Sequence, residues 1–209
     1  MDFLNLSTDN LQNFKSLSIP INENSITQGK TAYGVSKLAG EELVKAYSQR
    51  FPDLKYSILR FFNVFGPDQV NQFVVSKFIK NAIDRKPIII NGTGEQLRSY
   101  CYVDDAVKGM VMALKSDDAN SETINIGHQF NLISLNDLAK LVCKTVGVSE
   151  EIITNDLDFS DRDQSREIFE RCPDTSKARD LIGFEAKIGM EEAIKNIMEE
   201  SSFNENWPT

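Results

Sequence analysis

The sequence predicts an α/β fold with a largely parallel sheet. Runs of β-branched and aromatic residues alternate along the chain with segments of helical period. The first third of the chain already contains two such runs, with a long amphipathic segment between them. The strands and helices that we expect lie at residues 3–6, 31–50, 55–62, 73–83, 88–90, 123–126, 176–182 and 190–200.

The longest expected helix covers residues 31–50. Its apolar residues fall on one stripe, formed by Val35, Ala39, Leu43, Ala46 and Tyr47. Pro52 ends this helix, because proline disfavours helical backbone in the residue before it. The segment 55–62 follows as the strongest strand, since it is rich in β-branched and aromatic residues.

Two later helix starts carry capping residues. Ser134 and Asp137 have the spacing of a capping box, in which the first side chain accepts a hydrogen bond from the backbone of the second residue. We expect Asp104 or Asp105 to cap a helix that carries Val107, Met110, Val111 and Leu114. Residues 10–28 are polar and show no clear period, which indicates a surface loop.

The composition excludes several classes of protein. The chain has 209 residues, with 23 Lys and Arg against 31 Asp and Glu, and a net charge of −8. Hydrophobic residues make up 41% and charged residues 26%, which is typical of a globular protein. The acidic balance argues against nucleic-acid polymers and anionic membranes as partners. The longest apolar stretch, near Gly109, is too short to span a bilayer, and the start of the chain lacks a signal-peptide pattern.

The cysteines and the single histidine do not form a metal site in the sequence pattern. Cys101, Cys143 and Cys172 are widely spaced and contain no C-x-x-C pair. We interpret them as reduced, partly buried thiols of a cytoplasmic protein. His128 follows an expected strand, so we place it in a strand-end loop and predict no bound metal.

The sharpest local signal is the pair Tyr33 and Lys37 at the start of the first long helix. A spacing of four residues places both side chains on one face of a helix. A cation beside a phenol lowers the pKa of the phenol, which would make Tyr33 a general acid and base. The alternative is that this common spacing occurs by chance. Thr8, expected at the end of the first strand, offers a hydroxyl where ligands bind in α/β sheets.

Four ordered motifs resemble the extended short-chain dehydrogenase/reductase family of nucleotide-sugar epimerases and dehydratases. Thr8, Tyr33 and Lys37 resemble the catalytic triad of that superfamily. The four motifs, which follow one another in the family's order, read YGVSKLAGE from Tyr33, LRFFNVFGP from Leu59, GTGEQLRSYCYVDD from Gly92 and PDTSKARDLIG from Pro173. The resemblance covers essentially the whole chain, and the set is much more specific than the tyrosine–lysine spacing alone.

The resemblance implies roles for individual residues. Tyr33 would take a proton from a sugar hydroxyl while a hydride leaves the same carbon for the nicotinamide of NAD. Lys37 would lower the pKa of Tyr33 and bind the nicotinamide ribose, and Thr8 would orient the sugar oxygen. Phe62 would approach the nicotinamide, and Asn63 the substrate diphosphate. The catalytic group would be Thr8, Tyr33 and Lys37, and the cofactor would contact Tyr33, Lys37 and Phe62.

Three implied substrate contacts have structural alternatives. Asn63 either donates its amide to a phosphate oxygen or serves the turn before Gly66. Arg98 matches the diphosphate-binding arginine of the family, because a guanidinium suits phosphate, but it could be a solvated loop charge. Arg162 matches a second phosphate contact more weakly, and its acidic neighbours could hold it in a surface ion pair.

One part of the family pattern is missing from the sequence. The glycines form neither G-x-x-G-x-x-G nor G-x-G-x-x-G, the turn that seats the dinucleotide diphosphate. We therefore expect an incomplete Rossmann-type parallel sheet, with late strands and helices only, plus a smaller α/β substrate-binding domain. Residues 1–68 would form the Rossmann part with the tyrosine helix. Residues 69–209 would mainly bind substrate, with some segments returning to the Rossmann sheet.

The resemblance favours an NAD-dependent enzyme acting on a nucleoside-diphosphate hexose. A 4-epimerase is favoured over a 4,6-dehydratase, because position 10 is Asn10 where a dehydratase would carry Glu. Asp9 itself is more typical of a dehydratase. The alternatives are a non-catalytic module that binds sugar nucleotides and one half of a split enzyme. Partners would be the nucleotide-sugar substrate and either a second copy of the chain or another chain that supplies the missing Rossmann part.

Overall fold

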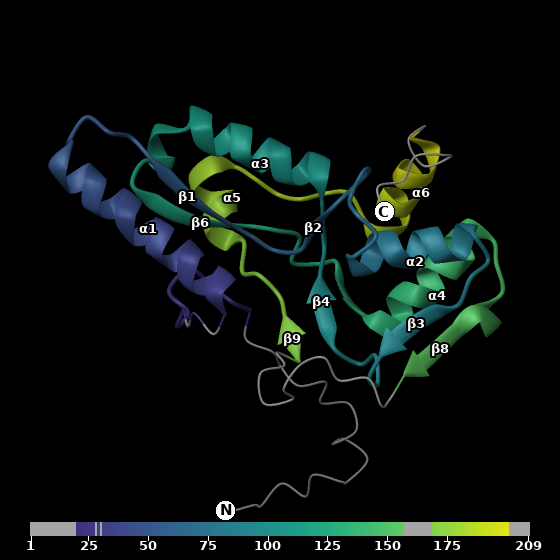
Figure 1. The fold of residues 1–209 in the computed structure, drawn as a ribbon. Helices are drawn as coiled ribbons and strands as arrows, with labels where there is room; N and C mark the ends of the chain where they lie inside the picture. The colour runs from purple at the N-terminus through teal and green to yellow at the C-terminus, as the bar shows by residue number, and fades with distance from the viewer. Residues whose placement is uncertain (1–19, 28, 30, 157–168, 201–209) are drawn as a thin grey trace, which may run out of the picture.

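The computed structural model describes residues 20–27, 29, 31–156 and 169–200. Its first region is built on the parallel pair β1 (Ser57–Phe61) and β6 (Glu122–Ile126). Helices α3 (Val103–Lys115) and α5 (Ser176–Ile182) pack on the face of this pair that carries Leu59 and Ile124. Helix α1 (Ala32–Arg50) runs along the opposite face, which carries Arg60 (Figure 1). This alternation follows from the period of two in a strand.

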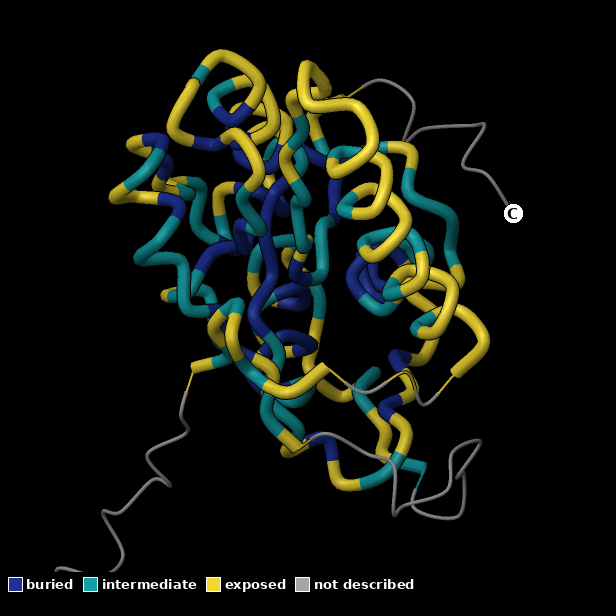
Figure 2. The backbone as a smooth tube through the Cα atoms, turned by 90° about the vertical axis from the view of Figure 1, so that its left-hand side faces the viewer, coloured by how far each residue is buried: buried dark blue, intermediate teal, exposed yellow. Residues whose placement is uncertain are grey.

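The second region contains most of the buried side chains. Helices α2 (Val74–Ile83), α4 (Leu135–Val146) and α6 (Met190–Glu199) pack around the parallel pair β3 (Ile88–Asn91) and β8 (Ile153–Asp156). Each of the three helices buries one apolar face in this core, which the dark segments of Figure 2 trace through the interior.

Short strands connect the two regions. Strand β2 (Val64–Phe65) pairs in parallel with β5 (Cys101–Tyr102). Strand β4 (Leu97–Ser99) pairs antiparallel with β7 (Leu132–Ser134) and in parallel with β9 (Glu170–Arg171). Two 3₁₀ turns, η2 (Asp117–Ala119) and η3 (Glu150–Ile152), complete the described elements. The carboxylate of Asp105, on α3, accepts hydrogen bonds from the backbone of Lys187 and Ile188 at 2.7 and 2.8 Å, which ties α3 to the segment that enters α6.

Most of the expected elements are confirmed to within a few residues. The α/β class with parallel strand pairs is confirmed, and so is the helix that starts after Thr31. Ser134 caps α4 as expected, since its hydroxyl accepts from the backbone N–H of Asp137 at 3.0 Å. The expected strand at residues 3–6 and the first part of the loop at 10–28 lie outside the described residues.

The expected cap at Asp104 or Asp105 is wrong. Helix α3 begins at Val103, Tyr102 is its N-cap residue, and no side chain caps it. Both aspartates lie within the first turn, where negative charge still favours the positive end of the helix dipole. The Asp105 carboxylate instead accepts a hydrogen bond from the backbone of Lys187, a contact that no local sequence pattern predicts.

Helix α1 differs from the other long helices in its exposure. In the part of the chain that the structure describes, none of its residues is buried. Val35, Leu43 and Tyr47, all on the expected apolar stripe, are 53%, 60% and 59% exposed. The expected apolar residues thus lie on a helix, and no other described residues bury them. No described helix is long and apolar enough to cross a membrane.

Candidate active site

The start of α1 presents Tyr33 and Lys37 together. The hydroxyl of Thr31 caps the helix by accepting a hydrogen bond from the backbone N–H of Gly34 at 3.0 Å. The ammonium nitrogen of Lys37 lies 5.1 Å from the centroid of the Tyr33 ring, a cation–π contact on the shared helix face. Tyr33 is 72% exposed, so its phenol is open to a ligand.

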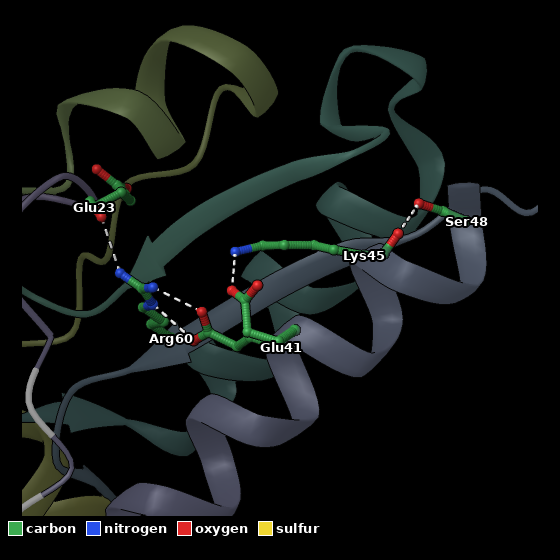
Figure 3. Close-up of polar contacts among 6 residues, drawn as sticks. Glu23, Glu41, Lys45, Ser48 and Arg60 are labelled. Atoms are coloured by element: carbon green, nitrogen blue, oxygen red, sulfur yellow. Dashed lines mark hydrogen bonds and ion pairs between the residues drawn. The ribbon is translucent and has the colours of Figure 1, made fainter. Parts of the chain in front are cut away.

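An ion pair holds α1 against β1. Arg60 donates two hydrogen bonds to Glu41, with nitrogen–oxygen distances of 2.8 and 2.7 Å, and a third to the backbone carbonyl of Glu23 at 3.0 Å (Figure 3). These hydrogen bonds from Arg60 hold the pKa of the Glu41 carboxyl below its ordinary value. The side chains of Arg60 and Glu41 are only 23% and 14% exposed, so the pair is more than a surface contact.

This pair fixes the level of Tyr33 along the sheet. Helix α1 runs antiparallel to β1 (Figure 1), and Tyr33 lies two turns before Glu41, about 12 Å along the helix axis. Phe62 lies two residues after Arg60, about 7 Å along the strand. Both therefore lie beyond the carboxyl end of β1, the edge at which α/β sheets bind ligands.

Phe62 and Asn63 are the two residues between the end of β1 and the start of β2. Phe62 is 5% exposed, and its backbone N–H donates to the carbonyl of Ile126 at 3.0 Å. Asn63 has a φ of 37°, in the left-handed region that asparagine tolerates better than most residues. Its amide donates to the carbonyl of Ser99, 36 positions away, at 2.8 Å. This bond ties Asn63 to the end of β4, and both expected roles of Asn63, in phosphate binding and in the turn before Gly66, stay predictions.

Arg98 lies in a strand and not in a loop. It lies in β4, and its guanidinium donates to the backbone carbonyls of Leu97 and Phe169 at 2.8 and 3.1 Å. Arg171, the register partner of Arg98 on β9, lies on the same face of the small sheet. The guanidinium carbon of Arg171 lies 5.4 Å from the centroid of the Phe62 ring.

The short segment before α1, residues 21–23, is hydrogen-bonded to two other parts of the chain. Ile21 forms a parallel bridge with Pro173, directly after Cys172 and β9. The carboxylate of Glu23 accepts from the backbone N–H of Asn125 at 2.7 Å. The Asn125 amide donates to the carbonyls of Ile21 and Asp174 at 2.9 and 3.1 Å. These bonds anchor the segment that leads into the tyrosine helix to β6 and to the residues that follow β9.

The structure therefore brings together part of the predicted site. Phe62, Asn63 and Arg98 form one cluster, and Tyr33 and Lys37 lie at the same edge of the sheet. Thr8 and Arg162 lie outside the described residues, and their roles stay predictions. Sequence reasoning missed Arg171. Its only signal is its position directly before Cys172 and the last family-like motif, and a single basic residue in a two-residue strand has no period to mark it.

Other titratable groups are structural. Burial raises the pKa of the Cys101 thiol to about 12, and all three cysteines are free and buried, as expected. Burial also lowers the pKa of His128, whose backbone carbonyl accepts a hydrogen bond from the Ser99 hydroxyl.

A surface hollow of about 490 Å³ lies between α4 and β8, and none of the cluster residues lines it. Among the described residues, no group of three or more His, Cys, Asp or Glu could hold a metal ion.

The comparison with known proteins decides the family. A model of the NAD dependent epimerase/dehydratase family matches residues 2–127. The chain belongs to this family. The match spans three of the four motifs that carry the resemblance, and the fourth, from Pro173, lies beyond it.

Individual relatives agree with the family. An uncharacterized UDP-glucose epimerase of Bacillus subtilis (strain 168) is 33% identical over 178 residues, which cover 84% of this chain and 53% of that protein. The crystal structure of a UDP-glucose 4-epimerase with UDP-glucose from Thermotoga maritima matches with a TM-score of 0.77 at 28% identity, covering 87% of this chain and 57% of that one. A UDP-glucuronic acid 4-epimerase from Bacillus cereus, in complex with UDP-glucuronic acid and NAD, matches with a TM-score of 0.77 at 29% identity, with the same coverage. The chain spans about half the length of the proteins that it matches.

Proposed function

We propose that this epimerase/dehydratase family member takes part in the NAD-dependent conversion of a nucleoside-diphosphate hexose, with 4-epimerisation favoured over 4,6-dehydration. One observation carries the proposal: the cluster of Phe62, Asn63 and Arg98 lies at the same sheet edge as the start of the helix that presents Tyr33 and Lys37. A proton-transfer group and a phosphate-binding group at one edge are what oxidation of a bound sugar nucleotide requires.

The residues would divide the work by their chemistry. The Tyr33 phenolate would accept the proton of a sugar hydroxyl, and Lys37, on the same face of α1, would stabilise the phenolate charge. Arg98 would bind the diphosphate, since its two backbone contacts fix the guanidinium in one orientation. In a 4-epimerase, the sugar would turn to present the opposite face of the same carbon for return of the hydride, and the proton would return from Tyr33 to the sugar oxygen.

The chain's residues fit one end of the cofactor. The buried ring of Phe62 would border a flat ring, and the exposed pair of Tyr33 and Lys37 would contact a ribose, as at the nicotinamide end of NAD. NAD would supply the hydride acceptor. The sequence contains no Gly-rich turn for the diphosphate end, so we assign no residue of this chain to that half.

The preference for epimerisation depends on residue 10. Dehydration needs an acid that expels water from the sugar, and Asn10 has no ionisable proton for this step. Epimerisation needs only proton transfer by Tyr33 and a keto-sugar intermediate that rotates within the site. Asn10 lies outside the described residues, so this preference rests on its chemistry alone.

The exposed stripe of α1 supports an association with another chain. Exposed apolar patches mark interaction sites, and we propose either a second copy of this chain or a chain that carries a dinucleotide-binding part as the occupant. Two separate cores support the proposed division near residue 68, with residues 101–126 and 176–186 returning to the Rossmann-type region. Three free buried cysteines support a cytoplasmic location.

The test is turnover that depends on Tyr33. The 209-residue chain is incubated with NAD and UDP-glucose, UDP-glucuronate or dTDP-glucose, alone and with a separately produced polypeptide that carries a Gly-rich strand–turn–helix. We expect epimer formation in at least one combination and a fall by about 10²- to 10⁴-fold in Tyr33→Phe. The matched control is Tyr56→Phe, a tyrosine that precedes β1 and belongs neither to the candidate site nor to the exposed stripe of α1, and it should retain full activity. Absence of turnover in every combination would overturn the enzymatic proposal.

A non-catalytic module that binds sugar nucleotides is the second candidate. The specific observation in its favour is that the Asn63 and Arg98 cluster is complete without any contact to Tyr33. Calorimetry separates the two: this candidate predicts binding of UDP-sugars without binding of NAD, whereas tight binding of NAD by the chain would exclude it.

A further inference from the structure

Arg60 joins three separate parts of the chain. From β1, its guanidinium donates two hydrogen bonds to the Glu41 carboxylate on α1, with nitrogen–oxygen distances of 2.8 and 2.7 Å. A third hydrogen bond, at 3.0 Å, goes to the backbone carbonyl of Glu23 in the segment before α1 (Figure 3). Because the guanidinium is planar and its acceptors belong to two different segments, these bonds fix its orientation as well as its position.

Asn125 extends this network across the sheet. It is the register partner of Arg60 on β6, and it is 1% exposed. Its backbone N–H donates to the Glu23 carboxylate at 2.7 Å, and its amide donates to the carbonyls of Ile21 and Asp174 at 2.9 and 3.1 Å. Glu23 is therefore held at its carbonyl by Arg60 and at its carboxylate by Asn125. Loss of these donors would leave buried acceptors without partners, which disfavours any shift of the segment.

The position of Tyr33 depends on these bonds because α1 has no buried face. In the described structure none of the 19 residues of α1 is buried, whereas α2, α4 and α6 each bury an apolar face. Tyr33 lies about 12 Å along the helix from Glu41, so a tilt of about 5° at Glu41 moves Tyr33 by about 1 Å. A displacement of that size in a reacting group can lower a rate by about 100-fold.

We infer that Arg60 is a positioning residue for the reaction, which together with Glu23 and Asn125 fixes the place of Tyr33 at the sheet edge. The two bonds to Glu41 hold the helix, and the bond to Glu23 prevents the guanidinium from turning with it. A lysine at position 60 keeps the charge, but its single nitrogen cannot reproduce the planar contact with both Glu41 oxygens and with the Glu23 carbonyl. The inference rests on the proposed function, in which Tyr33 transfers the proton.

The first test measures the position of α1 without any reaction. Spin labels are attached at Ser36→Cys on α1 and at Lys115→Cys on α3, two exposed positions, while the three native cysteines are buried. Double electron–electron resonance gives the distribution of distances between the labels. Arg60→Lys and Glu23→Ala should each broaden this distribution by about 1 Å, as the 12 Å separation along the helix implies. The control Lys55→Met removes an exposed ion pair that does not involve α1, and it should leave the distribution unchanged.

The second test measures turnover in the combination of components that supports the proposed reaction. Arg60→Lys and Glu23→Ala should lower kcat by about 10- to 100-fold and leave KM for the UDP-sugar within about threefold, because the proposed diphosphate contact at Arg98 is unchanged. A residue that only stabilised the fold would lower the midpoint of urea denaturation and leave kcat per folded molecule unchanged. Lys55→Met should change neither kcat nor KM.

The outcomes separate the inference from the function on which it rests. An unchanged distance distribution in both Arg60→Lys and Glu23→Ala would overturn the inference, whether or not the chain turns over. A broader distribution with an unchanged kcat would also overturn it and would leave the proposed function standing. Absence of turnover by the wild type in every combination would overturn the proposed function, and with it any role of Arg60 in the reaction. Circular dichroism identifies the folded variants, and Glu23→Ala, a substitution outside the helices and strands, decides if Arg60→Lys does not fold.

Discussion

Helices α1 and α2 both carry apolar residues, but those of α2 are concentrated on one buried face, whereas the apolar side chains of α1 are exposed. Helix α2 buries Val75, Phe78 and Ile79 in the second core. Helix α1 is nearly twice as long, yet in the described structure it buries no residue. It is held to its sheet mainly by the ion pair between Glu41 and Arg60.

The difference teaches that an amphipathic pattern predicts a helix and the side that needs cover, but not what covers it. In the second region α4 and β3 supply the cover for α2 within the same chain. In the first region the described residues leave the stripe of α1 to solvent. Since burial of a leucine side chain is worth about 1.5–3 kcal/mol, two such regions should respond very differently to the same substitution.

The largest effect should come from truncating matched residues on the two helices. Ile79→Ala and Leu43→Ala remove the same number of carbon atoms, from side chains that are 0% and 60% exposed. Ile79→Ala should lower the free energy of unfolding by about 2–5 kcal/mol, because it opens a cavity in a packed core. Leu43→Ala should change it by less than about 0.5 kcal/mol. Urea denaturation of both variants measures the two values.

The same pair of variants reveals whether α1 is covered in solution. A loss of more than about 2 kcal/mol in Leu43→Ala would mean that the stripe is buried against another molecule or segment. In that case the loss should depend on protein concentration if a second copy provides the cover.

A smaller loss of stability should follow from breaking the ion pair between Glu41 and Arg60, which holds α1 to β1. Glu41→Gln should cost about 1–2 kcal/mol at pH 7, since it removes charge from two hydrogen bonds of a half-buried pair. The pKa of Glu41 is lower in the folded protein than its ordinary value of 4.5. Its contribution is therefore fully present above about pH 4.5 and is lost as the pH falls through the folded-state pKa.

Urea denaturation at pH 7 and at successively lower pH values tests this sign. The wild type should lose more stability on acidification than Glu41→Gln does. Glu42→Gln is the matched control, because Glu42 forms only an exposed pair with Lys45 at 2.8 Å and its side chain is 73% exposed. Parallel pH profiles for the wild type and Glu41→Gln would show that the pair does not stabilise the fold.

The smallest effect should appear in the reactivity of the buried thiols. Cys101 belongs to the core of the first region and Cys143 to that of the second, and burial raises the pKa of both. Neither should react with N-ethylmaleimide until its region opens, since the thiolate is the reactive form. We expect Cys101 to react about threefold faster, because the less covered region opens at a lower free energy. Mass spectrometry of labelled peptides measures both rates, and equal rates would indicate a single cooperative unit.

Much of the fold was predictable from local patterns. The strand at 55–62 and the helices at 31–50, 73–83 and 176–182 have strong periods or clear end signals, and the structure places them there to within a few residues. The short strands β4 and β9 were missed, because two or three residues carry no measurable period. Asp105 was assigned to the wrong partner for a related reason: its hydrogen bonds reach residues more than 80 positions away.

The candidate site divides in the same way. The family-like motifs predict Tyr33, Lys37, Asn63 and Arg98 as site residues, and their roles stay predictions. Only the tertiary structure shows that the Asn63 amide donates a hydrogen bond to the carbonyl of Ser99. It also shows that Arg171 pairs in register with Arg98 and that its guanidinium contacts the ring of Phe62. Sequence patterns record local period and residue chemistry, whereas these contacts depend on strand register, which is set only when distant segments pair.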